Sequence, residues 1–99
     1  MHEYRDNYKY LYISTATTTP VTGNVTTSVP GSLIRIVVTE TAAGAITIYD
    51  AVAGSTTTTV GIMKASIAEG TYDFNVRIAQ GIQIVTAGAS KLTVVYSTL

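Results

Sequence analysis

The feature that most constrains the fold of this chain is a two-residue alternation of apolar and polar side chains. The stretch of residues 33–50 contains two such runs, one around Ile36 and the other around Ile48. This period is typical of β-strands with one buried face, because successive side chains of a strand point to opposite sides of the sheet. A short connection that contains Gly44 joins the two runs. The pattern therefore predicts two strands and indicates that they pair as a β-hairpin.

Similar runs recur along the rest of the chain, separated by turn-forming residues, and no segment has the 3.6-residue period of a helix. About seven or eight short strands with this spacing predict an all-β protein, an antiparallel two-sheet β-sandwich of jelly-roll-like architecture. The turn spacing leaves an immunoglobulin-like topology open as the alternative. The run around Val60 is expected to place Val60 and Ile62 in the core. The residues expected to share one buried core are Ile34, Ile36, Val38, Ile46, Ile48, Phe74, Ile82, Ile84 and Val94.

The length of 99 residues fits one domain. We expect residues 14–99 to form a single β-sandwich and residues 1–13 to be a separate Tyr-rich arm or the first strand of that sandwich. Four of the seven tyrosines fall in the first twelve residues, at Tyr4, Tyr8, Tyr10 and Tyr12. Tyrosine rings suit interfaces, since each has a large apolar body and a polar tip. These four residues are the candidate interface, and the alternative is ordinary packing of a first strand.

Composition points to an assembly subunit. Only 12% of the residues are charged, against about 25% in average proteins, and six acids balance six bases. Near-zero net charge favours association and provides no field that would attract nucleic acid or an anionic membrane. The N-terminus has no apolar core of a signal peptide, and no apolar run reaches the ~18 residues of a membrane helix. We therefore expect synthesis in a cytoplasm, with no nucleic-acid partner and no membrane.

The residues that carry catalysis are scarce. The chain has no Cys and its one histidine is His2, so neither a nucleophile–histidine pair nor a thiolate metal site is expected. Asp50, Glu69 and Asp73 are the acids considered for a carboxylate pair. Each falls at a strand end, in a turn or on the polar side of a strand, where a solvated acid is the simpler interpretation. We predict no catalytic residue, no metal site and no cofactor, and hence a protein that is not an enzyme.

Three short motifs occur in order along the chain. They are Ile-Thr-Ile-Tyr-Asp at residues 46–50, Gly-Ile-Gln-Ile-Val at residues 81–85 and Leu-Thr-Val-Val-Tyr at residues 92–96. With these motifs the chain resembles the small virion proteins of tailed bacteriophages, in particular capsid decoration (cement) proteins, over roughly residues 32–97. The Tyr-rich N-terminal segment lies outside the resemblance.

The resemblance implies a non-enzymatic β-sandwich on the exterior of the virion, synthesised in the host cytoplasm. Its partners would be further copies of itself, most simply as a homotrimer, and the shell of major capsid proteins. The alternative function is a glycan- or receptor-binding module of a tail fibre or another virion appendage. That alternative requires exposed aromatic side chains that converge on a pocket, whereas an assembly protein requires a flat contact surface.

Overall fold

The computed structural model describes residues 8–23, 28–53, 55 and 58–98 of the chain. Within these ranges the protein is all-β and contains no helix, as the alternation predicts. Eight strands form two antiparallel sheets of four, which confirms the expected β-sandwich class. The strands are β1 (Tyr8–Ile13), β2 (Thr18–Pro20), β3 (Gly31–Glu40), β4 (Ile46–Asp50), β5 (Thr59–Met63), β6 (Gly70–Ile78), β7 (Ile82–Thr86) and β8 (Lys91–Thr98).

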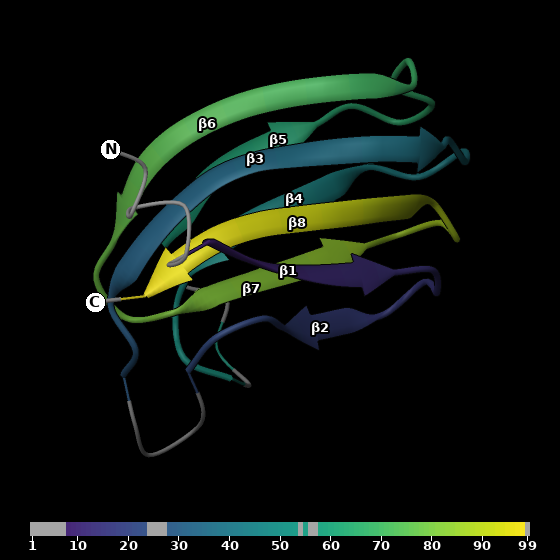
Figure 1. The fold of residues 1–99 in the computed structure, drawn as a ribbon. Coiled ribbons are helices and arrows are strands. Elements are labelled where there is room, and N and C mark those ends of the chain that lie inside the picture. The colour runs from purple at the N-terminus through teal and green to yellow at the C-terminus, as the bar shows by residue number, and fades with distance from the viewer. Residues whose placement is uncertain (1–7, 24–27, 54, 56–57, 99) are drawn as a thin grey trace, which may run out of the picture.

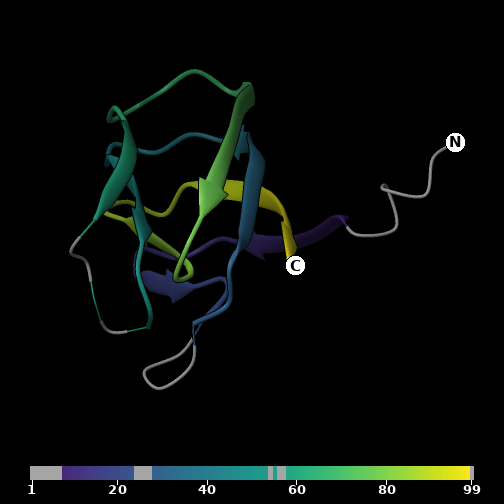
Figure 2. The ribbon, with the colours of Figure 1, turned by 90° about the vertical axis from the view of Figure 1, so that its left-hand side faces the viewer.

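The two sheets face each other as two layers (Figures 1 and 2). The first, here called sheet A, has the order β1-β8-β3-β6, and the second, sheet B, has the order β2-β7-β4-β5. The pairings are nested in sequence: β4 pairs with β5, β3 with β6, β2 with β7 and β1 with β8. The first and last strands of the described residues are therefore neighbours, and sheet A is complete only when β1 has paired with β8.

The core lies between the inner faces of the sheets. It is built from the alternate residues of six long strands and from Ile13 at the end of β1. Seven of the nine residues expected in the core are buried, namely Ile36, Val38, Ile46, Ile48, Ile82, Ile84 and Val94, and Phe74 packs against them while partly exposed. The alternation along β6 is also as predicted, with Tyr72, Phe74, Val76 and Ile78 on the inner side.

The predicted hairpin of residues 33–50 is wrong. Its two strands form, but β3 pairs with β6 and β8 in sheet A, whereas β4 pairs with β5 and β7 in sheet B. The connection after Glu40 therefore crosses from one sheet to the other. At this crossing Gly44 lies against Gly88 of the β7–β8 turn, so closely that a Cβ on Gly44 would stand 2.2 Å from the Gly88 nitrogen. Glycine permits this contact between two turns, and a short Gly-containing loop is compatible with both geometries.

Two of the expected core positions are displaced by bulges. In β3 the register shifts between Leu33 and Arg35, so that Leu33 is fully buried and Ile34 is only half-buried. In β5 the shift opposite Ile48 and Tyr49 leaves Val60 partly buried and directs Ile62 outward, where it is 67% exposed, while Met63 joins the core. A β-bulge adds a residue to one strand and so reverses the side on which the following side chains lie.

Candidate functional site

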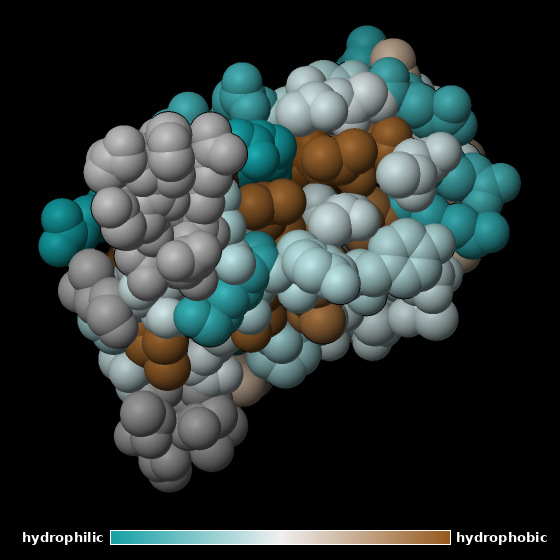
Figure 3. Space-filling view, viewed as in Figure 1, coloured by the Kyte–Doolittle hydropathy of each residue, from teal (hydrophilic) through white to brown (hydrophobic). Residues whose placement is uncertain are grey.

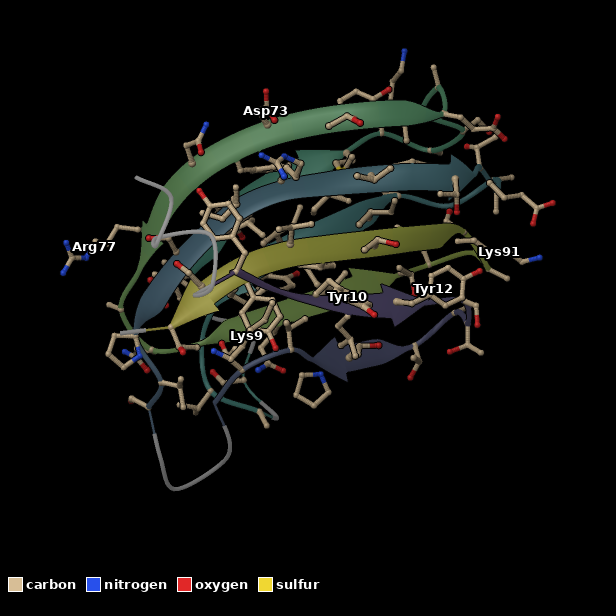
Figure 4. The ribbon with its side chains drawn as sticks, viewed as in Figure 1. Lys9, Tyr10, Tyr12, Asp73, Arg77 and Lys91 are labelled. Carbon is tan, nitrogen blue, oxygen red and sulfur yellow. The ribbon has the colours of Figure 1, made fainter. Side chains whose placement is uncertain are left out.

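Three tyrosines of β1 form an exposed row on the outer side of sheet A. Tyr8, Tyr10 and Tyr12 are 40%, 74% and 52% exposed, while Leu11 and Ile13 on the other side of the strand pack in or against the core. The alternation places all three rings on one side of the strand because successive side chains point to opposite faces. Figure 4 shows Tyr10 and Tyr12 in front of the ribbon of sheet A. We call these three residues the tyrosine row.

Strand register extends the tyrosine row across the sheet. Tyr10 lies opposite Val95 of β8, which lies opposite Arg35 of β3, which in turn lies opposite Asp73 of β6. Directly opposed residues of antiparallel strands share a face. The outer face of sheet A thus changes from aromatic at β1, through small and β-branched side chains at β8, to a mixed β3 that carries Arg35, and to charged and polar side chains at β6.

Two further rows follow the same gradient. They are Tyr12–Thr93–Val37–Thr71 and Tyr8–Ser97–Ser32–Arg77. Val37 and Val95 are half-buried although they point away from the core, because their neighbours on the same face cover them in part. Figure 3 shows hydrophobic surface in the middle of this face, bordered by hydrophilic side chains.

Ion pairs border the face. The Arg35 Nε lies 3.6 Å from the Asp73 Oδ1, and the Lys91 Nζ lies 2.7 Å from the Glu40 Oε1. The hydrogen bond and the charge of Glu40 raise the pKa of Lys91 above its ordinary value, and Tyr12 adds a smaller effect in the same direction. All four charged side chains are substantially exposed, so these pairs contribute little to stability. They place charged side chains on β3, β6 and β8, away from the aromatic edge at β1.

The acids considered for catalysis are not brought together. Asp50 lies in β4 of sheet B, Asp73 pairs with Arg35 on the outer face of sheet A, and Glu69 accepts a hydrogen bond from the backbone N–H of Thr41. His2 and Tyr4 lie outside the described residues.

Asp50 instead holds a turn. Its two carboxylate oxygens accept hydrogen bonds from the backbone N–H groups of Ala79, at 3.0 Å, Gln80, at 2.8 Å, and Gly81, at 3.4 Å. These three residues connect β6 to β7, so one side chain of sheet B fixes the crossover from sheet A. Sequence reasoning placed Asp50 correctly at a strand end but did not identify this contact, because its partners lie some thirty residues away.

The described part of the chain has no pocket and no group of three or more His, Cys, Asp or Glu side chains placed to hold a metal ion. Within the same ranges no helix is long and apolar enough to cross a membrane. The tyrosine row and the face behind it are therefore the main surface feature. The sequence identified three of its residues, and it missed Val37 and Val95, which were visible as apolar residues at outward-facing strand positions.

Comparisons of this chain with protein-family models, with curated proteins and with solved structures find no match.

Proposed function

We propose that this protein is a non-enzymatic structural protein of a virus particle, which decorates and cements the capsid of a tailed bacteriophage by binding the major capsid protein shell. The observation that carries the proposal is the tyrosine row on the outer face of sheet A, where Tyr8, Tyr10 and Tyr12 are all at least 40% exposed. Aromatic rings held in water on a rigid strand are typical of protein interfaces.

The rest of the face fits the same role. Val95 of β8 adjoins Tyr10, Val37 lies one strand further on in β3, and Arg35 of β3 is paired with Asp73 of β6. Because Arg35 is paired with Asp73, an interface over this face would not bury an unpaired charge. A surface without a pocket suits a broad, flat partner, such as a lattice of capsid proteins, better than a small molecule.

Strand topology also supports the proposal. Nested pairing of eight strands, from β4–β5 at the centre to β1–β8 at the outside, is the arrangement that we assign as a jelly roll. Jelly rolls are common in viral capsid proteins and in lectins. The assignment agrees with the likeness to decoration proteins in the three sequence motifs.

The exposed tyrosines also favour a second candidate, a glycan- or receptor-binding module of a tail fibre or another virion appendage. Aromatic rings stack on sugars, and lectins share the jelly-roll topology. In this protein the rings follow one straight strand and do not converge on a cavity in the described residues. That geometry favours the shell-binding function.

Under this proposal the protein is made in the host cytoplasm and resides on the capsid exterior, bound to shell protein and to further copies of itself.

The test uses emptied heads of the phage that encodes the chain, stripped of this protein. We expect saturable binding with a fixed number of copies per head, measured by co-sedimentation, and loss of at least tenfold in affinity for Tyr10→Ser/Tyr12→Ser. A Thr71→Ser/Arg77→Ser variant, changed on β6 at the same face, is the matched control and should bind as the unaltered protein does.

Failure of the folded protein to bind heads at any concentration would refute the proposal. A glycan array is the test of the second candidate. Specific glycan binding that the same tyrosine substitutions abolish, without head binding, would establish that candidate in its place.

A further inference from the structure

The four edges of the two sheets differ in how open they are to another strand. The edges belong to β1 and β6 in sheet A and to β2 and β5 in sheet B. An edge strand presents unpaired backbone N–H and C=O groups, and folded proteins commonly protect such edges with short strands, prolines or bulges.

Three of the four edges carry such protection. β2 is three residues long and ends in Pro20. β5 contains Gly61 and has a register shift against β4. β6 has Asn75 in its interior with a φ of 53°, beside the register shift in β3 at Leu33/Arg35. A left-handed residue and a bulge bend this strand away from the regular geometry that a further strand needs.

β1 is different. Its six residues pair with β8 in unbroken register from Tyr8 to Ile13, and it contains no glycine, proline or residue with positive φ. It is rich in tyrosine and aliphatic residues, which favour strands. In sheet A its pairing is with β8 alone, so in the described part of the chain no strand is hydrogen-bonded to its other edge. Lys9 is the one charged residue of the strand, and a lysine can protect an edge. Its Nζ, however, donates a hydrogen bond to the Thr98 Oγ1 of β8, on the paired side of β1.

We infer that two copies of the protein associate through β1, which pairs with β1 of the second copy in antiparallel orientation about a two-fold axis at Tyr10. A two-fold axis perpendicular to the sheet makes the pairing antiparallel and the interface self-complementary. The two four-stranded sheets then become one continuous sheet. This deepens the proposed function and rests on it in one respect, that the chain associates with itself.

The side chains of β1 select the register. With the axis at Tyr10, Tyr8 lies opposite Tyr12 of the second copy, Tyr10 lies opposite its own counterpart, and Lys9 lies opposite Leu11 of the second copy. All six rings then share one face, and aromatic cross-strand pairs stabilise a sheet. Tyr10, the most exposed ring at 74%, then lies beside its own counterpart at the centre of the pair.

The neighbouring registers are worse. An axis at Lys9 would place two ammonium groups directly opposite each other, which destabilises a strand pair. An axis at Leu11 would place Lys9 opposite Ile13, which is 97% buried in the core, and would leave Tyr8 without a partner. The charge of Lys9 and the extent of the tyrosine row thus both favour the axis at Tyr10.

The area of contact indicates a weak pair. Edge pairing covers only the free edge of one six-residue strand and the facing flanks of its side chains, which is less than the ~800 Å² per partner of a standard interface. The fraction of paired copies in solution should therefore rise with protein concentration. It should be high where many copies are held side by side, as on a capsid. This geometry favours two copies over the trimer that the resemblance implies.

The experiment uses opposite charges at the axis. Tyr10→Lys and Tyr10→Glu each place two like charges opposite one another, so each variant alone should associate at least tenfold more weakly than the unaltered protein. An equimolar mixture of the two should regain association, at least tenfold tighter than either variant alone, and should lose it as salt is raised. Sedimentation velocity over a concentration series measures this, and circular dichroism establishes that the variants are folded.

Two controls separate edge pairing from other contacts. Thr71→Lys and Thr71→Glu put the same charges on β6, on the same face of sheet A, and should leave association unchanged. Hydrogen exchange should show amides of β1 becoming protected as concentration rises, which stacking of two tyrosine faces would not produce.

An unaltered protein that stays monomeric up to millimolar concentration overturns the inference. So does a mixture of folded Tyr10 variants that associates no better than its components, or loss of association in the Thr71 variants. Head binding by a strictly monomeric protein would remove this inference and leave the proposed function standing. Self-association through β1 without head binding would support this inference and refute the proposed function.

Discussion

At the scale of single residues, the bulge in β3 gives two isoleucines on either side of Arg35 different environments. Ile36 is fully buried between the sheets, whereas Ile34 is half-buried at the register shift. Ile36→Ala should lower the free energy of unfolding by about 2–5 kcal/mol, because it leaves a cavity in the core. Ile34→Ala, the matched control, should cost less than about 1.5 kcal/mol. Urea denaturation of both variants measures the difference, and equal costs would contradict the placement of the bulge.

Gln83 is a buried polar residue whose cost can be tested. It is fully buried on β7; its Nε2 donates a hydrogen bond to the Thr22 carbonyl at 3.3 Å, and its Oε1 has no hydrogen-bond partner. A buried acceptor without a partner costs about 1–3 kcal/mol. Gln83→Met, of similar size and shape, removes that cost together with the one hydrogen bond, so its stability should be unchanged or higher by up to about 1 kcal/mol.

Gln83→Glu is the contrasting variant, because it buries a charge at the same site without a partner. It should be clearly less stable than the unaltered protein at neutral pH. A thermal melt of the two variants side by side checks this. If Gln83→Met lost as much stability as Gln83→Glu, the Gln83 amide would stabilise the fold, and the prediction that its unpaired Oε1 is costly would be wrong.

At the scale of elements, most strands were predictable from the sequence because side-chain alternation is a local signal. The alternation of β6 and of β4 survives in the structure, and seven of the nine expected core residues are buried. Ile34 and Ile62 were misplaced because a bulge depends on the partner strand, which a local pattern does not contain. The predicted hairpin was wrong for the same reason. The connection around Gly44 has the length and composition of a hairpin loop, but β3 pairs with β6 and β8, and β4 pairs with β5 and β7.

The turn between β6 and β7 depends on one carboxylate. Asp50 accepts hydrogen bonds from three consecutive backbone N–H groups, of which the shortest is 2.8 Å to Gln80. Asp50→Ala removes all three acceptor contacts and should lower the free energy of unfolding by about 1–3 kcal/mol.

Asp73→Ala is the control for this prediction. Asp73 also loses an interaction, but its pair with Arg35 is exposed, so the cost should stay below about 1 kcal/mol. Chemical denaturation of both variants at the same pH makes the comparison. Equal stability of the two would show that the Asp50 carboxylate does not hold the turn.

At the scale of the whole molecule, the nested topology makes the two ends of the chain interdependent. β1 covers one edge of β8 while β3 covers the other, and Ile13 at the end of β1 is a core residue. Residues 8–13 are therefore a strand of sheet A that also carries the tyrosine row. The sequence left open whether this segment is an arm or a first strand, because alternation and exposed tyrosines are compatible with both.

This double role of β1 separates folding from association. Tyr8→Thr/Tyr10→Thr/Tyr12→Thr keeps the strand, since threonine also favours β-structure, and alters only the outer face. The triple variant should unfold cooperatively, with a loss of no more than about 2 kcal/mol from three cross-strand pairs. It should not self-associate and should not bind heads.

Deletion of residues 1–13 should act differently. It removes Ile13 from the core, at a cost of about 2–5 kcal/mol from that side chain alone, and it uncovers the β1 edge of β8. Because domains of this kind have only about 5–15 kcal/mol of stability in total, the truncated chain should be unfolded or nearly so at room temperature. Far-ultraviolet circular dichroism and urea denaturation of the two variants decide the matter. A truncated chain that kept the stability of the full chain would mean that β1 contributes only an interface, and a triple variant that unfolded would mean that the tyrosines serve the sandwich itself.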